Sequence, residues 1–180
     1  DVKSMHKLFY HSDLINIILT DLRTDSVEDF SYMFANINPN SLDLSKFDTS
    51  NAKNMSHMFS GASSLSSLNL SNFKTSNVED MSYMFERCES TSLFTFTKDF
   101  DTVKVKNMAG MFKDCISLSS IDISMFDTSN VEDMSHMFED LCSVDEIDLS
   151  NFDTRNVKNM ASMFYYCTAL EDINLSKFNT

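Results

Sequence analysis

The sequence has 180 residues, and 42% of them are hydrophobic, which suffices for one domain with a closed core. Its formal net charge of −13 argues against nucleic acid and anionic membranes as partners, because both are bound through clustered Lys and Arg side chains. No apolar run approaches the roughly 20 residues that span a bilayer.

One template recurs along the whole chain. Two Gly and one Pro leave the turns to Asn, Asp, Ser and Thr, while 16 Phe and 13 Met point to repeated use of the same core positions. A motif of the form Met-x-x-Met-Phe recurs in steps of 25, 25, 26, 27, 26 and 26 residues and ends at Phe9, Phe34, Phe59, Phe85, Phe112, Phe138 and Phe164. This spacing indicates an array of one supersecondary unit.

The first half of each unit carries an L-x-x-L-x-L-x-x-F pattern. It predicts a short strand and the turn that follows it, because apolar residues alternate along a half-buried strand. The first copy is Leu14, Ile17, Leu19 and Leu22, the clearest is Leu65, Leu68, Leu70 and Phe73, and the last is Leu170, Ile173, Leu175 and Phe178.

The second half of each unit carries apolar residues at positions i, i+3, i+6 and i+7. This spacing is one face of an α-helix of two to three turns. The clearest copy is Val78, Met81, Met84 and Phe85. On the outer surface of these helices, charges of alternating sign share one position in successive units, namely Glu28, Lys53, Glu79, Lys106, Glu132 and Lys158. Such a ladder is expected to fix the register of stacking.

Neither element can bury its apolar face alone, so the units must stack. The expected fold is a right-handed, leucine-rich-repeat-like α/β solenoid of about seven rungs, with a parallel sheet on one side and short helices on the other. We expect residues 1–180 to form a single domain that is a piece of a longer repeat protein. The motif phenylalanines from Phe59 through Phe164 should form one aromatic column, and a second should contain Phe47, Phe73, Phe100, Phe126, Phe152 and Phe178.

Three phrases resemble a known family of repeats: LDLSKFDTSNAKNMSHMF, LNLSNFKTSNVEDMSYMF and IDISMFDTSNVEDMSHMFEDLC. They are similar to the repeats of BspA-like leucine-rich repeat surface proteins, also described as the DUF285 or mycoplasma-type repeat. The resemblance covers essentially the whole chain and is weakest at Leu22-Arg23-Thr24-Asp25 and Thr102-Val103-Lys104-Val105. It implies an extracellular or cell-surface protein of a bacterium or mucosal protist, associated with adhesion, and it carries over no binding residue.

Cysteine and histidine give no pattern typical of catalysis or of a metal site. Cys88, Cys115, Cys142 and Cys167 follow the motif phenylalanine and read as buried thiols, since no C-x-x-C pair exists, although a disulfide or metal stays open. His6, His11, His57 and His136 read as exposed side chains on the helix surface. Because Gly-rich phosphate loops and nucleophile motifs are also missing, we expect no enzyme activity and no cofactor.

A threonine recurs after the strand of every unit. A flat ladder of hydroxyls can bind ice or glycans, but hydroxyls at a chain reversal more often bond turn amides, and we favour that structural role. The column is Thr24, Thr49, Thr75, Thr102, Thr128, Thr154 and Thr180.

The strand face is the default ligand-binding surface of stacked repeats. Its outward positions carry acids, which favour a basic partner over Ca²⁺, because no loop concentrates oxygen ligands. A solvated face without a ligand is the competing interpretation. The predicted ligand-facing set is Asp43, Asp122, Asp148, Glu146 and Asp172.

The sequence thus predicts a non-enzymatic binding or adhesion module that recognises a protein or glycan on a host or neighbouring cell surface. The alternative is a structural spacer or coat array without a specific ligand. A hydrolase stands third, because it would require a His, Asp and Ser cluster that occurs only once.

Overall fold

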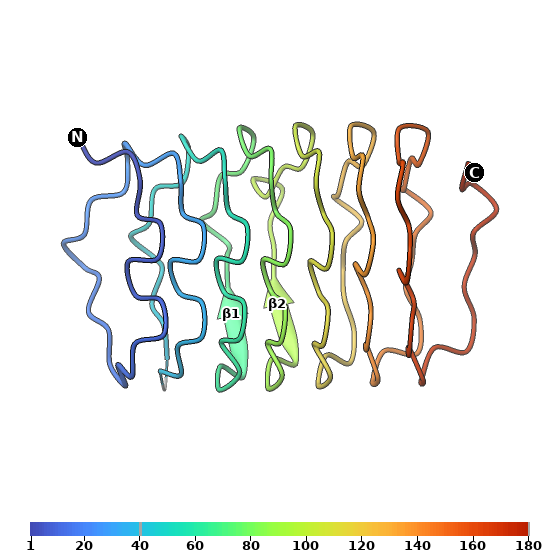
Figure 1. Ribbon diagram of the computed structural model, residues 1–180, viewed down its shortest axis with the longest axis horizontal. Helices are drawn as coiled ribbons and strands as arrows, with labels where there is room; N and C mark the ends of the chain where they lie inside the picture. Colours follow the sequence, from blue (N-terminus) through green and yellow to red (C-terminus); the bar gives the residue numbers. More distant parts are fainter. Residues whose placement is uncertain (40, 180) are drawn as a thin grey trace.

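The computed structural model describes residues 1–39 and 41–179 and shows a chain that winds into a stack of similar turns, with its two termini at opposite ends (Figure 1). Neighbouring turns of the stack are joined at one equivalent position by parallel bridges between single residues. A winding is defined here as the stretch from one such bridge residue to the next. The bridge residues are Ser4, Asp29, Asn54, Asp80, Asn107, Asp133 and Asn159.

Regular secondary structure is far sparser than the sequence predicts. Two strands, β1 (Ser67–Asn69) and β2 (Leu93–Thr95), pair in parallel. Elsewhere in residues 1–39 and 41–179 the pairing is limited to single bridges, and no helix is present. The predicted right-handed α/β solenoid of about seven rungs, with a sheet on one side and short helices on the other, is therefore wrong.

Chains of tight turns replace the predicted helices. Around Phe59, the amide groups of Met58 and Ser60 donate to carbonyl oxygens three residues earlier, at 3.2 and 3.1 Å. The alternate amides, those of His57 and Phe59, donate instead to the next winding, both at 2.9 Å. An α-helix bonds each interior amide to the carbonyl four residues earlier. Dividing the amides between local turns and the next winding excludes a helix here.

Each turn segment contains two residues with left-handed backbone, four positions apart. In the segment around Phe59 these are His57, with φ of 55°, and Gly61, with φ of 71°. Both glycines of the chain, Gly61 and Gly110, occupy such positions. The same segment buries Met55, Met58, Phe59 and Ala62. A four-residue turn repeat therefore buries the positions i, i+3, i+4 and i+7, as a helix does, so periodicity alone cannot separate the two structures.

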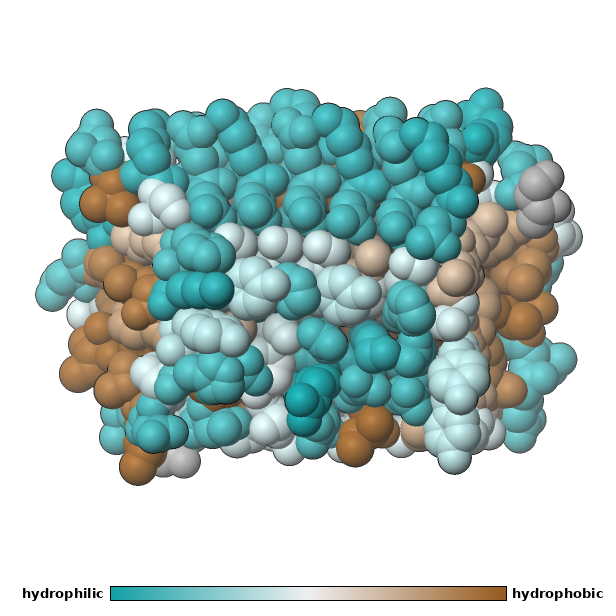
Figure 2. Space-filling view, in the orientation of Figure 1, coloured by the Kyte–Doolittle hydropathy of each residue, from teal (hydrophilic) through white to brown (hydrophobic). Residues whose placement is uncertain are grey.

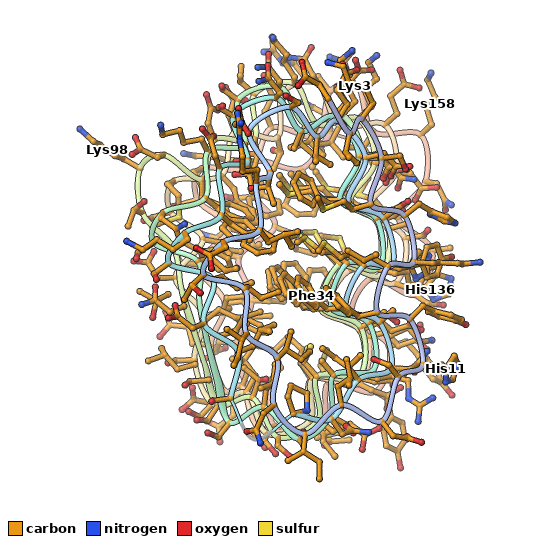
Figure 3. All side chains as sticks on the ribbon, turned by 90° about the vertical axis from the view of Figure 1, so that its left-hand side faces the viewer. Lys3, His11, Phe34, Lys98, His136 and Lys158 are labelled. Carbon is orange, nitrogen blue, oxygen red and sulfur yellow. The ribbon has the colours of Figure 1, made fainter. Side chains whose placement is uncertain are left out.

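A column of stacked phenylalanine rings fills the middle of the windings, and Phe34 marks its place in Figure 3. Ring centroids of neighbouring windings are 5.5 to 6.1 Å apart, and the planes differ by 19° or less. The predicted column from Phe59 through Phe164 is thus confirmed, and the structure extends it to Phe34 and Phe9. Its members are Phe9, Phe34, Phe59, Phe85, Phe112, Phe138 and Phe164.

The second predicted column is only partly formed. Phe100 and Phe126 stack with centroids 5.8 Å apart. The others with an aromatic neighbour pack with tilted rings against the first column, as Phe73 does against Phe59 at 6.4 Å and 39°. Burying a ring of this size contributes about 1.5–3 kcal/mol of stability wherever it packs, so both arrangements serve the core.

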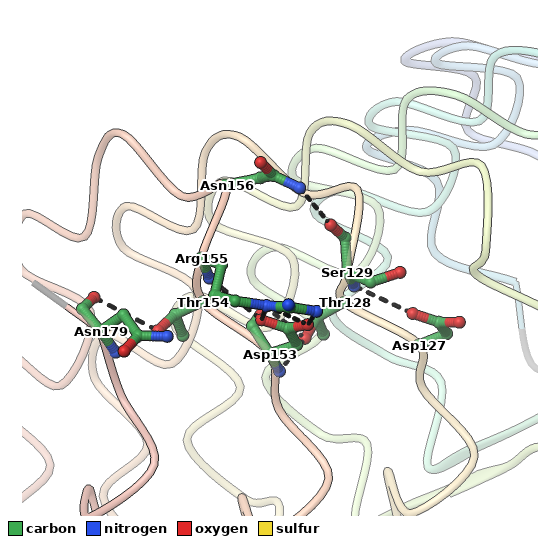
Figure 4. Close-up of polar contacts among 8 residues, drawn as sticks. All are labelled: Asp127, Thr128, Ser129, Asp153, Thr154, Arg155, Asn156 and Asn179. Carbon is green, nitrogen blue, oxygen red and sulfur yellow. Dashed lines mark hydrogen bonds and ion pairs between the residues drawn. The ribbon is translucent and has the colours of Figure 1, made fainter.

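The buried threonines hold the chain where it passes from the strand side towards the bridge residues. Thr154 Oγ1 donates to the carbonyl oxygen of Asn179 at 3.3 Å, and the Asn179 amide donates back to Thr154 Oγ1 at 2.7 Å (Figure 4). Thr49 makes the same two bonds with Lys74. The prediction that these hydroxyls satisfy turn groups is confirmed, and Thr180 lies outside the described residues.

Candidate functional site

The five predicted acids on the strand side are exposed, and three of their carboxylates are engaged in hydrogen bonds. In Asp43, Asp122 and Asp148, Oδ1 accepts a hydrogen bond from the amide of the serine two residues later, at 2.9, 3.1 and 2.9 Å. Hydrogen bonds from these serines hold the pKa of all three carboxyl groups below the usual value. Each carboxylate therefore stays ionised at neutral pH, and its Oδ1 atom is engaged with the backbone two residues later.

Three of the five predicted residues meet in one cleft, here called the acidic cleft. Glu146 and Asp172 are bridge partners in neighbouring windings, and together with Asp148 they line a volume of about 520 Å³. Ile173 also lines it and is 37% exposed, so that carboxylates and an apolar side chain share one depression. The other two predicted acids are not among the lining residues.

The charge ladder runs along one edge of the stack, marked by Lys3 and Lys158 in Figure 3 and visible as a hydrophilic band along the upper edge in Figure 2. Its residues lie directly before the bridge residues and not on helices. In the described residues no ion pair joins Lys53 to Glu79 or Lys106 to Glu132, so the predicted continuous ladder is divided into separate groups. The pairs are Lys3–Glu28 (3.0 Å), Lys53–Glu28 (2.7 Å), Lys106–Glu79 (2.7 Å) and Lys158–Glu132 (2.6 Å).

The left-handed positions before the motif phenylalanine carry a column of stacked rings. His57 lies between Tyr32 and Tyr83, with ring centroids 4.3 and 4.9 Å apart and planes within 9° of parallel. In the winding before Tyr32, the Nζ of Lys7 lies over the Tyr32 ring, 5.2 Å from its centroid. The rings cover one another's faces, so this column serves packing and offers no free platform for a ligand. The two tyrosines and His57 are half-buried, and not fully exposed as predicted.

A buried ion cluster lies beside this column. Glu139 is 8% exposed, and its carboxylate accepts from Lys113 Nζ at 2.6 Å and contacts Nδ1 of His136. Burial alone would raise the pKa of Glu139, but hydrogen bonds from Lys113 and His136 hold it below the usual value. No serine or cysteine side chain is hydrogen-bonded to His136 in the described part of the chain.

The cysteines are free thiols. Cys88 and Cys115 are buried, and their thiols donate to the carbonyl oxygens of Phe59 and Phe85 at 3.4 and 3.1 Å. Burial raises the pKa of Cys88 to about 12 and that of Cys115 well above its usual value. Both thiols are therefore inert at neutral pH, as the buried-thiol interpretation predicts, whereas Cys142 and Cys167 are only half-buried.

One irregularity of the stack was not assigned a role from the sequence. In four windings an asparagine side chain donates to a backbone carbonyl of the preceding winding at 2.7 to 2.9 Å, and these residues are Asn51, Asn77, Asn130 and Asn156. Two other windings have no asparagine at the equivalent position: Ser26 occupies it in one, and Lys104, which bonds Asn77 Oδ1 at 2.7 Å, occupies it in the other. The available signal for Lys104 was the departure of residues 102–105 from the repeat.

The interrupted asparagine ladder borders a groove of about 510 Å³, here called the Lys104 groove. It opens along the charge ladder, and every side chain that lines it is polar or charged except that of Val103. The lining is Glu79, Val103, Lys104, Lys106, Asn130, Glu132, Asn156 and Lys158.

No group of three or more His, Cys, Asp or Glu side chains among residues 1–39 and 41–179 is placed to hold a metal ion. The same part of the chain contains no helix with the length and apolar character needed to cross a membrane.

Comparison with known proteins gives one match. A family model described as "Mycoplasma protein of unknown function, DUF285" matches residues 1–96 and again residues 89–180. No curated protein and no solved structure matches the chain.

Proposed function

The chain belongs to the family of mycoplasma proteins of unknown function named DUF285, and we propose that it is a recognition module that carries out no catalytic step. Its partner is a protein or glycan on a host or neighbouring cell surface. The location at the cell surface rests on the resemblance of the repeats alone. The choice of binding surface rests on one observation, the acidic cleft formed by Glu146, Asp148 and Asp172.

The cleft combines the two features that an extended basic partner requires. Glu146, Asp148 and Asp172 supply negative charge, and Asp148 is held ionised by its bonds to Ser150. Ile173, which is 37% exposed, supplies apolar area beside them. Complementary charge accelerates encounter, and apolar contact slows dissociation. A segment with alternating Lys and aliphatic residues fits this surface.

The test removes negative charge from the acidic cleft while keeping the hydrogen bond between residue 148 and the amide of Ser150. Asn69 already accepts the amide of Ser71 at 3.0 Å in the position equivalent to Asp148, so Asp148→Asn should keep the fold. We expect Asp148→Asn with Asp172→Asn to slow association of a labelled dodecapeptide of alternating Lys and Val, most clearly at low salt, with an unchanged melting temperature.

The matched control is Asp43→Asn, because Asp43 has the same hydrogen bond to a serine but lies outside the cleft. This variant should associate like the native chain. Equal association rates for the double variant and the native chain would remove the acidic cleft from consideration.

The second candidate function is a structural spacer. It is favoured by the unbroken phenylalanine column, which continues from winding to winding. Tandem fusions of the chain should then scatter X-rays as a stiff rod that lengthens in proportion to copy number, with no probe bound.

A further inference from the structure

The Lys104 groove contains one cation that the protein leaves without a carboxylate partner. Its other two lysines are neutralised, Lys106 by Glu79 at 2.7 Å and Lys158 by Glu132 at 2.6 Å. None of the ion pairs in the described residues includes Lys104, whose Nζ bonds only the amide oxygen of Asn77. The groove therefore carries one uncompensated positive charge on a chain whose net charge is −13.

The departure from the repeat is what creates this charge. An asparagine at position 104 would donate to the carbonyl oxygen of Ser76, as Asn77 donates to that of Ser50 at 2.9 Å. No hydrogen bond to the Ser76 carbonyl is found within residues 1–39 and 41–179. The chain thus gives up a structural hydrogen bond at one winding and gains an exposed ammonium group beside a groove.

The rest of the lining is a mixture of donors and acceptors around a small apolar surface. Glu79 and Glu132 present carboxylate oxygens, Asn130 and Asn156 present amide oxygens, and the ammonium groups keep donors beyond those in the ion pairs. Val103 is 36% exposed and supplies methyl groups. A volume of about 510 Å³ lies within the range of small-ligand sites.

We propose that the Lys104 groove binds a carboxylate-bearing oligosaccharide, with the sugar carboxylate on Lys104 and the ring hydroxyls on the surrounding glutamates and asparagines. A sugar chain uses every part of this lining: one anion for the free ammonium, hydroxyl donors for the acceptor oxygens, and C–H faces for Val103. An acidic peptide fits less well, because its successive carboxylates would be repelled by Glu79 and Glu132.

The Lys104 groove and the acidic cleft are separate sites with no lining residue in common. The cleft lies on the strand side and takes a cation, whereas the groove lies on the charge ladder and takes an anion. Failure of one proposal leaves the other standing, since each has its own residues and its own probe.

The experiment is an NMR titration of the native chain with a linear sugar trimer in which one galacturonic acid lies between two galactose residues, so that the ligand carries a single carboxylate. We expect saturable shifts of the amides of residues 103–106 and 130–132, and an affinity at least tenfold weaker for the methyl ester of the same trimer. Lys104→Asn should weaken binding of the acid trimer at least tenfold. Lys104→Arg, which keeps the charge, should stay within about threefold of the native affinity.

The melting temperatures of the same variants show whether a loss of binding comes from a loss of folding. Lys104→Asn restores the residue found in four equivalent windings, so its melting temperature should equal or exceed that of the native chain. Asp148→Asn with Asp172→Asn should leave trimer binding unchanged. The proposal is overturned if the acid trimer does not bind, if ester and acid bind equally, if Lys104→Asn binds like the native chain, or if a hexaglutamate peptide binds as tightly as the trimer.

Discussion

Thr128 and Asp153 hold each other through two hydrogen bonds across neighbouring windings. Thr128 Oγ1 donates to the carbonyl oxygen of Asp153 at 3.1 Å and accepts from the Asp153 amide at 2.8 Å (Figure 4). Thr128 is 1% exposed, so water cannot replace its hydroxyl. Both backbone groups of one turn residue thus depend on a single buried oxygen atom.

The first prediction concerns this hydroxyl. Thr128→Val keeps the shape of the side chain but leaves the amide and carbonyl of Asp153 without partners, and it should lower the free energy of unfolding by about 1–3 kcal/mol. Thr128→Ser keeps the oxygen and loses one methyl group, so it should cost less. Urea denaturation of the native chain and the two variants gives the three free energies of unfolding. A Val variant as stable as the Ser variant would mean that the hydroxyl of Thr128 does not stabilise the fold.

The second prediction concerns Gly110. A Cβ at this position would lie 2.2 Å from Cε1 of Tyr83, whereas one at Gly61 would lie 2.2 Å from Oδ1 of Asn36. Both glycines have left-handed φ, which costs an alanine about 1–2 kcal/mol. The Tyr83 ring is stacked on His57 and cannot swing away freely, so Gly110→Ala should destabilise the chain more than Gly61→Ala.

A double-mutant cycle isolates the contribution of the ring. Tyr83→Ser combined with Gly110→Ala should recover the excess loss and leave only the backbone strain. Thermal or urea unfolding gives the four free energies. Additive effects of the two substitutions would mean that the ring does not oppose the new Cβ.

The third prediction is a pH dependence. The pKa of Glu139 is held below its ordinary value of 4.5 in the folded chain. A carboxyl group with a depressed folded pKa contributes stability above its unfolded pKa and loses that contribution as the pH falls through the folded value. The gap in unfolding free energy between the native chain and Glu139→Gln should thus be largest near neutral pH and shrink below about pH 4.5.

Urea melts at several pH values test this dependence. Glu171→Gln serves as the control, because Glu171 is exposed and makes no ion pair in the described residues, and its gap should be small at every pH. A gap for Glu139→Gln that does not change with pH would remove the ion cluster as its cause.

The fourth prediction concerns the charge ladder. Glu79→Lys replaces an attraction to Lys106 by repulsion and places a third positive charge between Lys53 and Lys106. It should lower the melting temperature more at about 0.01 M salt than at about 1 M salt, since the screening length falls from roughly 30 Å to 3 Å. Glu79→Gln should lower the melting temperature with the same salt dependence but by a smaller amount. A decrease in melting temperature that does not depend on salt would contradict an electrostatic cause.

The candidate sites were predicted from the sequence to unequal degrees. The acidic positions were found because strand alternation places Asp43, Asp122 and Asp148 outward. The meeting of Glu146, Asp148 and Asp172 in one cleft was not predictable, because it depends on how two neighbouring windings pack. The Lys104 groove was signalled by a break in the repeat, but its shape arises from side chains of four windings.

The sequence by itself determined the period and register of the windings, the buried phenylalanine column and the role of the threonine column, because each follows from which residue type recurs at which position. Only the tertiary structure decided the path of the backbone. A helix and a four-residue turn repeat bury the same positions around Met55, Met58 and Phe59. What separates them is the partner of each amide, and alternate amides here bond carbonyl groups about 25 residues away in the next winding, a choice made by stacking and not by local pattern.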